Sequence, residues 1–387
     1  MTLPLRWTSS TFSVNPYIQL DRINRYEKGK TEMVNDSERL LSAFSELHFY
    51  KELVQSNLHF TLEGSTEKEV ADLLINVGDF IIAIQLKARN EKEQTFDEQK
   101  ELKWLTSKCK KAKKQMKESI QFIRSGQLPA FENGRSKLVS LISNAEIVPL
   151  VVFMNETVGD DYPHILQKHS EDGMDVNCLS FQDFQNMCRA LLTPMEIIYY
   201  LQWRLNFYRK CGNVSTSVFI GNNDNFLFVK PTHGEALVYQ FIAERYGTET
   251  DKTMKQYVAD FSFILCNLPD RVVVESEQDS SYPLILFFAH FDRMEIKAYV
   301  ERVFKTIDAA KKGTYNIVGS LRNERQHYVI VFVSTHDGYF LDIDFLEEVA
   351  RKKCDFDILL QVNCYWENEE NFRIDYCFRD DAGRYLK

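Results

Sequence analysis

The chain has 387 residues, of which 44% are hydrophobic and 27% charged, and its formal net charge is −9. This length predicts two domains, each large enough to bury a core of its own. The negative charge excludes a surface coated with basic residues for nucleic acid, so any such contact must be local. No apolar run approaches the roughly 20 residues of a membrane span, and we expect no membrane partner.

Cysteine and histidine usage narrows the chemistry further. The eight cysteines stand singly and none forms a C-x-x-C motif, which argues against a zinc site or a disulfide framework. They are typical of reduced thiols, and the N-terminus lacks a signal-peptide pattern, so we expect a cytoplasmic protein. The eight histidines are isolated, and no spacing supports Ser/His/Asp catalysis.

Hydrophobic periodicity in the first half predicts the order helix, three strands, helix, strand. Residues 1–34 show no clear periodicity. The expected elements are a helix over 35–54, strands over 57–62, 70–77 and 80–86, a long amphipathic helix over 97–124 and an apolar strand over 147–154. Because a turn signal, Asn76-Val77-Gly78-Asp79, separates the second and third strands, these two are expected to form a hairpin.

The remaining residues predict a strand, two helices and then a second α+β unit. The linker candidate is 211–225, which is rich in Gly, Asn and Ser. We therefore predict domains over 1–210 and 211–387, the second of regulatory or assembly role. The expected strands are 175–180, 226–230, 284–288, 328–333, 357–363 and 372–378, and the expected helices are 181–192, 194–208, 251–266, 294–311 and 344–353.

Three polar side chains interrupt the apolar hairpin: Asp72, Gln85 and Lys87. Gln85 and Lys87 share one face of their strand, and a turn centred on residues 77 and 78 would place Asp72 opposite Ala83, with Gln85 as its diagonal neighbour. Burying such groups is costly unless they have partners or a function. One interpretation is a structural Asp–Lys ion pair with a hydrogen-bonded Gln; the other is a reactive site.

The amino-acid sequence of the hairpin, K-E-V-A-D-L-L-I followed by I-Q-L-K-A-R, resembles the core of the PD-(D/E)xK nuclease superfamily in its Q-x-K variant. Ala71 stands where the proline of that motif would be. The stretch also resembles nuclease-like domains of bacterial defence proteins, in which a glutamate often occupies the position of Glu69. The resemblance covers about the first half of the chain. It implies an α/β fold, with an N-terminal αβββαβ restriction-endonuclease-like core before the C-terminal α+β domain.

The resemblance implies a metal-dependent nuclease. Mg²⁺ or Mn²⁺ would be held by Asp72, Gln85, the main-chain carbonyl of Leu86 and a carboxylate from the first helix, and Lys87 would stabilise the attacking hydroxide and the phosphate. The first helix offers Glu38, Glu46 and Glu52, among which the resemblance favours Glu38. Glu69 faces away from Asp72 on an ideal strand, so it joins the site only if a bulge turns it.

A basic surface beside this site is the candidate nucleic-acid interface. Arg89 continues the face of Gln85 and Lys87 and is a candidate phosphate ligand. The long helix carries many lysines around its apolar stripe, which predict either a phosphate-tracking surface or a solvated helix face. They are Lys100, Lys103, Lys108, Lys110, Lys111, Lys113, Lys114 and Lys117.

The expected function is hydrolysis of nucleic acid, DNA rather than RNA, in bacterial antiviral defence. The resemblance leaves open a homo-oligomer or a partner protein of a defence system. Two alternatives remain. The first is a catalytically inactive nuclease fold that binds nucleic acid or a protein partner. The neutral Gln85 in place of a carboxylate favours this alternative. The second is an interaction scaffold in which the hairpin charges are purely structural.

Overall fold

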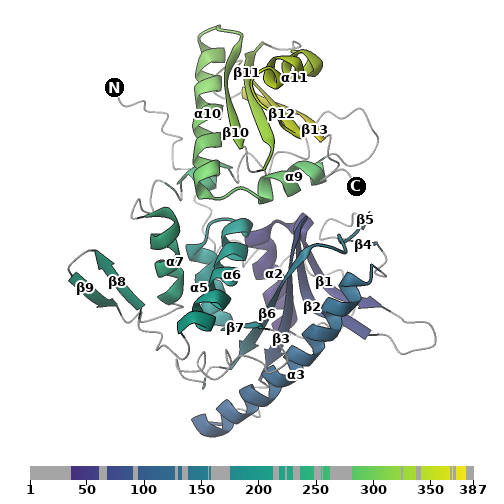
Figure 1. Ribbon diagram of the computed structural model, residues 1–387, viewed down its shortest axis with the longest axis vertical. Helices are drawn as coiled ribbons and strands as arrows, with labels where there is room; N and C mark the ends of the chain where they lie inside the picture. Colours follow the sequence, from purple (N-terminus) through teal and green to yellow (C-terminus); the bar gives the residue numbers. More distant parts are fainter. Residues whose placement is uncertain are drawn as a thin grey trace.

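A computed structural model describes most of the chain as a mixed α/β protein with two mixed sheets (Figure 1). Sheet β1-β2-β3-β6-β7 belongs to the first half and sheet β10-β11-β12-β13 to the second. The described residues are 36–60, 68–89, 95–126, 130–132, 138–155, 157, 175–211, 218–222, 225–229, 236–247, 254, 256–261, 281–323, 326–336, 341–366, 368 and 372–380.

The first half has the predicted order of helix, three strands, helix, strand. Strands β1, β2 and β3 are antiparallel, whereas β6 and β7 continue the sheet in parallel. The elements are α2 (Asp36–Phe49), η1 (Lys51–Leu53), β1 (Val54–Phe60), β2 (Lys68–Val77), β3 (Phe80–Ala88), α3 (Glu98–Arg124), β4 (Phe131–Glu132), β5 (Leu138–Val139), β6 (Glu146–Met154), β7 (Asn177–Ser180), α5 (Phe181–Ala190) and α6 (Pro194–Cys211).

Alternation along the hairpin strands sends apolar side chains to both faces of this sheet, which is why helices cover both. Leu73 and Ile84 belong to the core that α2, α5 and α6 share. Leu74 and Ala83 pack on the opposite face with Met116 of α3. The long helix α3 lies across this second face (Figure 1), so the residues that alternate with Leu73 and Ile84 come to lie under α3.

The hairpin is confirmed, but its register differs from the expected one. Val77 pairs with Phe80 and Leu74 with Ala83, so the turn residues are Gly78 and Asp79 rather than 77 and 78. Gly78 has φ +68°, which glycine adopts without strain, and its N–H donates to Asn76 Oδ1 at 3.1 Å. A turn that is shifted by one residue shifts the β3 partner of each β2 residue by two positions. One step past the last pair, Leu73 with Ile84, this register would set Gln85 opposite Asp72, so the predicted face is kept.

The second half contains the predicted sheet and several elements that were not expected. Predicted strands over 226–230, 328–333, 357–363 and 372–378 and helices over 294–311 and 344–353 are confirmed within a few residues. The elements are β8 (Val218–Asn222), β9 (Asn225–Val229), α7 (Ala236–Tyr246), α9 (Ser281–Ala289), α10 (Arg293–Lys311), β10 (Ile317–Asn323), β11 (Tyr328–Thr335), α11 (Ile343–Arg351), β12 (Ile358–Trp366) and β13 (Phe372–Asp380).

Two predictions in this half are wrong. The strand predicted over 284–288 lies inside helix α9, whose apolar residues are buried all round, so that periodicity could not tell helix from strand. Part of the predicted linker 211–225 is strand β8, paired with β9. Of the predicted helix 251–266, residues 254 and 256–261 are described and are helical. Residues 1–34 lie outside the described residues.

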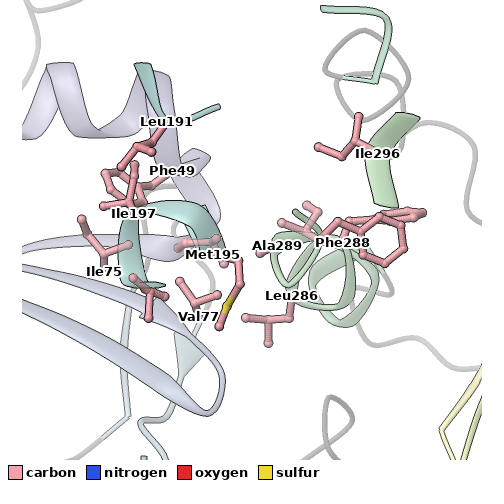
Figure 2. Packing of buried hydrophobic residues seen from close by; sticks show 14 of the residues in the cluster. Phe49, Ile75, Val77, Leu191, Met195, Ile197, Leu286, Phe288, Ala289 and Ile296 are labelled. Atoms are coloured by element: carbon pink, nitrogen blue, oxygen red, sulfur yellow. The ribbon is translucent and has the colours of Figure 1, made fainter. Parts of the chain in front are cut away.

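Helix α9 lies between the two sheets and joins their cores (Figure 1). Figure 2 shows Val77 and Met195 of the first half close to Leu286 of α9, all in one buried cluster. A buried ion pair crosses the same junction: Arg293 Nε donates to Glu196 Oε1 at 2.7 Å, and Arg293 Nη2 donates to Glu196 Oε2 at 2.9 Å. The division into domains 1–210 and 211–387 stays a prediction.

Candidate metal and nucleic-acid site

The structure brings Asp72, Gln85 and Lys87 together on the α3 side of the first sheet. Lys87 Nζ donates to Gln85 Oε1 at 3.1 Å and lies 3.8 Å from Asp72 Oδ2. Asp72 and Gln85 are 8% and 2% exposed, and the Lys87 side chain is 14% exposed. The three groups that sequence reasoning selected therefore form one contact cluster.

Asp72 occupies the point where the ladder between β2 and β3 ends. The last main-chain pair on this side is Leu73 with Ile84. Beyond it, the Leu86 N–H donates to the Asp72 carboxylate. A carboxylate held by a main-chain amide has a fixed orientation, which a ligand site requires. Leu86 thus reaches the site through its amide; a ligand role for its carbonyl stays a prediction.

Glu69 joins the cluster through a bulge in β2. The pairing of β1 with β2 shifts between Leu58 and His59, which adds one residue to β2 between Ala71 and Glu69. The Glu69 carboxyl hydrogen-bonds to Asp72. The bulge therefore overrides the strict alternation that would have turned Glu69 away from Asp72.

The electrostatics of Glu69 show that a further acid, Glu38 of α2, lies near. Partial shielding from water raises the pKa of Glu69 to about 7, and the negative charges of Asp72 and Glu38 act in the same direction. Lys87 opposes them. Two carboxylates thus oppose the ionisation of Glu69, and a bound cation would relieve that repulsion.

The two other acids near the first helix are placed differently. Glu46 lies eight residues after Glu38 on α2, about 12 Å along the helix axis, so Glu38 is the α2 acid that the structure brings to the cluster. Glu52 is buried in η1, and its charge acts on the phenol of Tyr282. Since Tyr282 accepts a hydrogen bond from Asn76 at 3.4 Å, Glu52 belongs to the turn end of the hairpin.

Arg89 is held by a buried acid, Glu101, and its expected role as a phosphate ligand stays a prediction. Its Nε donates to Glu101 Oε2 at 3.0 Å, and its guanidinium lies 5.4 Å from the centre of the Trp104 ring. Glu101 is completely buried and also accepts hydrogen bonds from Thr95 and Asn155. Burial alone would raise the pKa of Glu101, but these hydrogen bonds outweigh it and the pKa is lowered.

Glu101 was not among the predicted site residues, although the sequence carries a signal for it. Glu101 stands four residues before Leu105, in line with Cys109 and Ala112 on the buried stripe of α3. An acid on an apolar helix stripe needs a buried cation. Arg89, which follows β3 on the same side of the sheet, was available for that role.

Helix α3 presents most of its lysines to solvent. The Asp97 side chain caps the helix by accepting from Gln99 N and Lys100 N, at 3.1 and 3.2 Å, and the predicted helix 97–124 is confirmed. Lys113 is half-buried. The exposed lysines are Lys100, Lys103, Lys108, Lys110, Lys111, Lys114 and Lys117; we call this set the lysine face. It is a local basic surface on an acidic protein.

The donor set around Asp72 suits a hard cation. Carboxylate oxygens of Asp72, Glu69 and Glu38 and the amide oxygen of Gln85 are the ligand types that Mg²⁺ and Mn²⁺ accept. Within the described ranges, no three His, Cys, Asp or Glu side chains already stand in ligating positions. Glu69 and Asp72 are instead hydrogen-bonded to each other, so binding a cation requires that this contact opens.

Comparison with known proteins gives no assignment. No protein-family model, no curated protein and no solved structure matches the chain. Among the helices that the structure describes, none has both the length and the apolar character needed to cross a membrane.

Proposed function

We propose that the protein is a metal-dependent nuclease with a restriction-endonuclease-like core, and that it hydrolyses phosphodiester bonds of DNA. The observation that carries the proposal is the cluster of Asp72, Gln85 and Lys87 at the end of the hairpin ladder, with Glu69 beside it. The order of elements in the first half supports the same assignment. A role in bacterial antiviral defence follows from the sequence resemblance alone.

The residues of the cluster divide the chemistry between them. Mg²⁺ would be held by Asp72, Glu69 and Glu38, with Gln85 and the Leu86 carbonyl as neutral ligands; when bound, it supplies a water of lowered pKa and neutralises phosphate charge. Gln85 carries no charge, so the metal is held less tightly than by a carboxylate at that position. Lys87 places positive charge where negative charge develops on the phosphate.

Cleavage assays test the proposal directly. Purified protein is incubated with supercoiled plasmid, linear duplex, single-stranded DNA and RNA, in Mg²⁺ or Mn²⁺ and with or without EDTA. We expect cleavage that EDTA abolishes and that Asp72→Asn removes. Asp79→Asn, an exposed turn residue of the same hairpin, is the matched control and should cut like the wild type. Cleavage that survives in Asp72→Asn refutes the site.

A second candidate function is nucleic-acid binding without cleavage. Gln85 is neutral, almost fully buried and already bound to Lys87, and these features favour an inactive nuclease fold over a strong metal site. This candidate predicts binding to nucleic acid and no cutting in any divalent cation. The same assays, combined with a binding titration, separate the two functions.

A further inference from the structure

We propose that Phe96 is a stacking platform for an unpaired nucleic-acid base, so that the substrate is a strand with single-stranded character. The inference rests on the proposed function and adds the substrate class to it. The Phe96 side chain is completely exposed. Single exposed apolar residues are common on proteins, so the argument depends on how Phe96 is held and on what surrounds it.

The backbone on both sides of Phe96 is fixed. Before it, the N–H and the Oγ1 hydroxyl of Thr95 both donate to Glu101 Oε1, each at 3.1 Å. After it, Asp97 is tied to α3 as the helix cap. The aromatic ring therefore projects into solvent from an anchored segment, and stacking on it costs little ordering of the protein.

The residue that holds the segment before Phe96, Glu101, also binds the end of the strand that carries the candidate site. Glu101 holds Arg89 as well as Thr95, and Arg89 follows Lys87 by two residues on the same chain segment. The lysine face follows Phe96 beyond two exposed acids, Asp97 and Glu98. Its first member, Lys100, lies 3.4 Å from Asp97 through its Nζ, and Lys103 is exposed on the next turn of α3. The exposed ring thus precedes the lysine face at the start of α3, near the strand of the site.

An aromatic ring beside cations matches single strands better than duplexes. Proteins that hold single strands combine basic surfaces for the backbone with aromatic rings on which bases stack. In an intact duplex both faces of an internal base are already stacked on its neighbours, so the ring finds no partner there. The charge of the lysine face favours an anionic strand over an apolar protein surface as the partner of Phe96.

The test is binding of a fluorescent 15-nucleotide oligo-dT, measured by anisotropy in EDTA so that no cleavage occurs. Loss of one base stack costs about 1–3 kcal/mol, which corresponds to about 5- to 140-fold weaker binding at 1.4 kcal/mol per tenfold change. We expect that loss for Phe96→Ala and near wild-type binding for Phe96→Trp. Phe345→Ala, which removes a 51%-exposed phenylalanine of α11, is the matched control and should bind normally.

The outcomes separate this inference from the proposed function. Wild-type affinity in Phe96→Ala, or an equal loss of affinity for a blunt 15-base-pair duplex, overturns the stacking platform and leaves the nuclease proposal standing. A dimer that Phe96→Ala converts to a monomer would assign the ring to contact between copies and also overturns the inference. Failure of the wild type to bind any nucleic acid refutes the proposed function itself.

Discussion

Replacing Glu69 with glutamine tests whether the acids around Asp72 repel one another. Shielding from water, Asp72 and Glu38 raise the pKa of Glu69 from 4.5 to about 7. The folded protein therefore keeps a proton between these pH values that the unfolded chain has lost. The stability that this proton contributes is complete below about pH 4.5 and is lost as the pH rises to about 7.

The difference between 4.5 and about 7 corresponds to at most ~3.4 kcal/mol at 1.36 kcal/mol per pH unit. Because Glu69 is only partly shielded and keeps contact with water, screening reduces the expected cost of its ionisation to ~1 kcal/mol. Glu69→Gln should therefore exceed the wild type in free energy of unfolding by ~1 kcal/mol at pH 8 and equal it at pH 5.

Urea unfolding followed by circular dichroism at both pH values measures the effect. Glu118→Gln, on the exposed side of α3, is the matched control and should differ from the wild type at neither pH. A gain of equal size at pH 5 and pH 8 in Glu69→Gln would refute the reasoning, because it would arise from packing or hydrogen bonding and not from charge.

Three further changes probe the site, the lysine face and the junction. Lys87→Ala should lower plasmid cleavage at least ~100-fold, and unchanged cleavage would exclude Lys87 from the chemistry. The same change should lower the free energy of unfolding in urea by ~1–3 kcal/mol, because it leaves the shielded Asp72 carboxylate without its neighbouring cation. Arg293→Ala should lower the free energy of unfolding by ~3–5 kcal/mol in the same assay, because the carboxylate of Glu196 stays buried without its cation. A loss below ~1 kcal/mol would contradict this. Charge reversal at Lys110, Lys111 and Lys114 of the lysine face should reduce the slope of the logarithm of the nucleic-acid binding constant against the logarithm of the salt concentration by about 0.9 per lysine. An unchanged slope would mean that these side chains contact only solvent.

Much of the first half could be predicted because local patterns there agree with tertiary packing. The stripe of α3 and the apolar alternation of the hairpin each have one period, and each element buries the face that its pattern predicts. The register of the hairpin could not be fixed, because the sequence allowed turns centred one residue apart. Helix α9 was misassigned because a short segment that is apolar on every side has no period to read.

The candidate site was predictable to the extent that alternation governs it. Gln85 and Lys87 share a face by strand geometry alone, and Asp72 reaches them under either register. Glu69 required a bulge, which depends on the pairing of β1 with β2 and leaves no mark in the sequence of β2. The pairing of Arg89 with Glu101 was not foreseen because Glu101 lies beyond the strand, where only the packing of α3 brings the two together.

The most direct test of the central claim is anomalous X-ray scattering from a crystal grown or soaked with Mn²⁺. We expect one peak within metal-ligand distance of an Asp72 carboxylate oxygen, roughly 2.0–2.3 Å, with Glu69 turned from Asp72 toward the ion. A well-ordered site at which Asp72, Glu69 and Lys87 keep their mutual contacts and no manganese binds would contradict it.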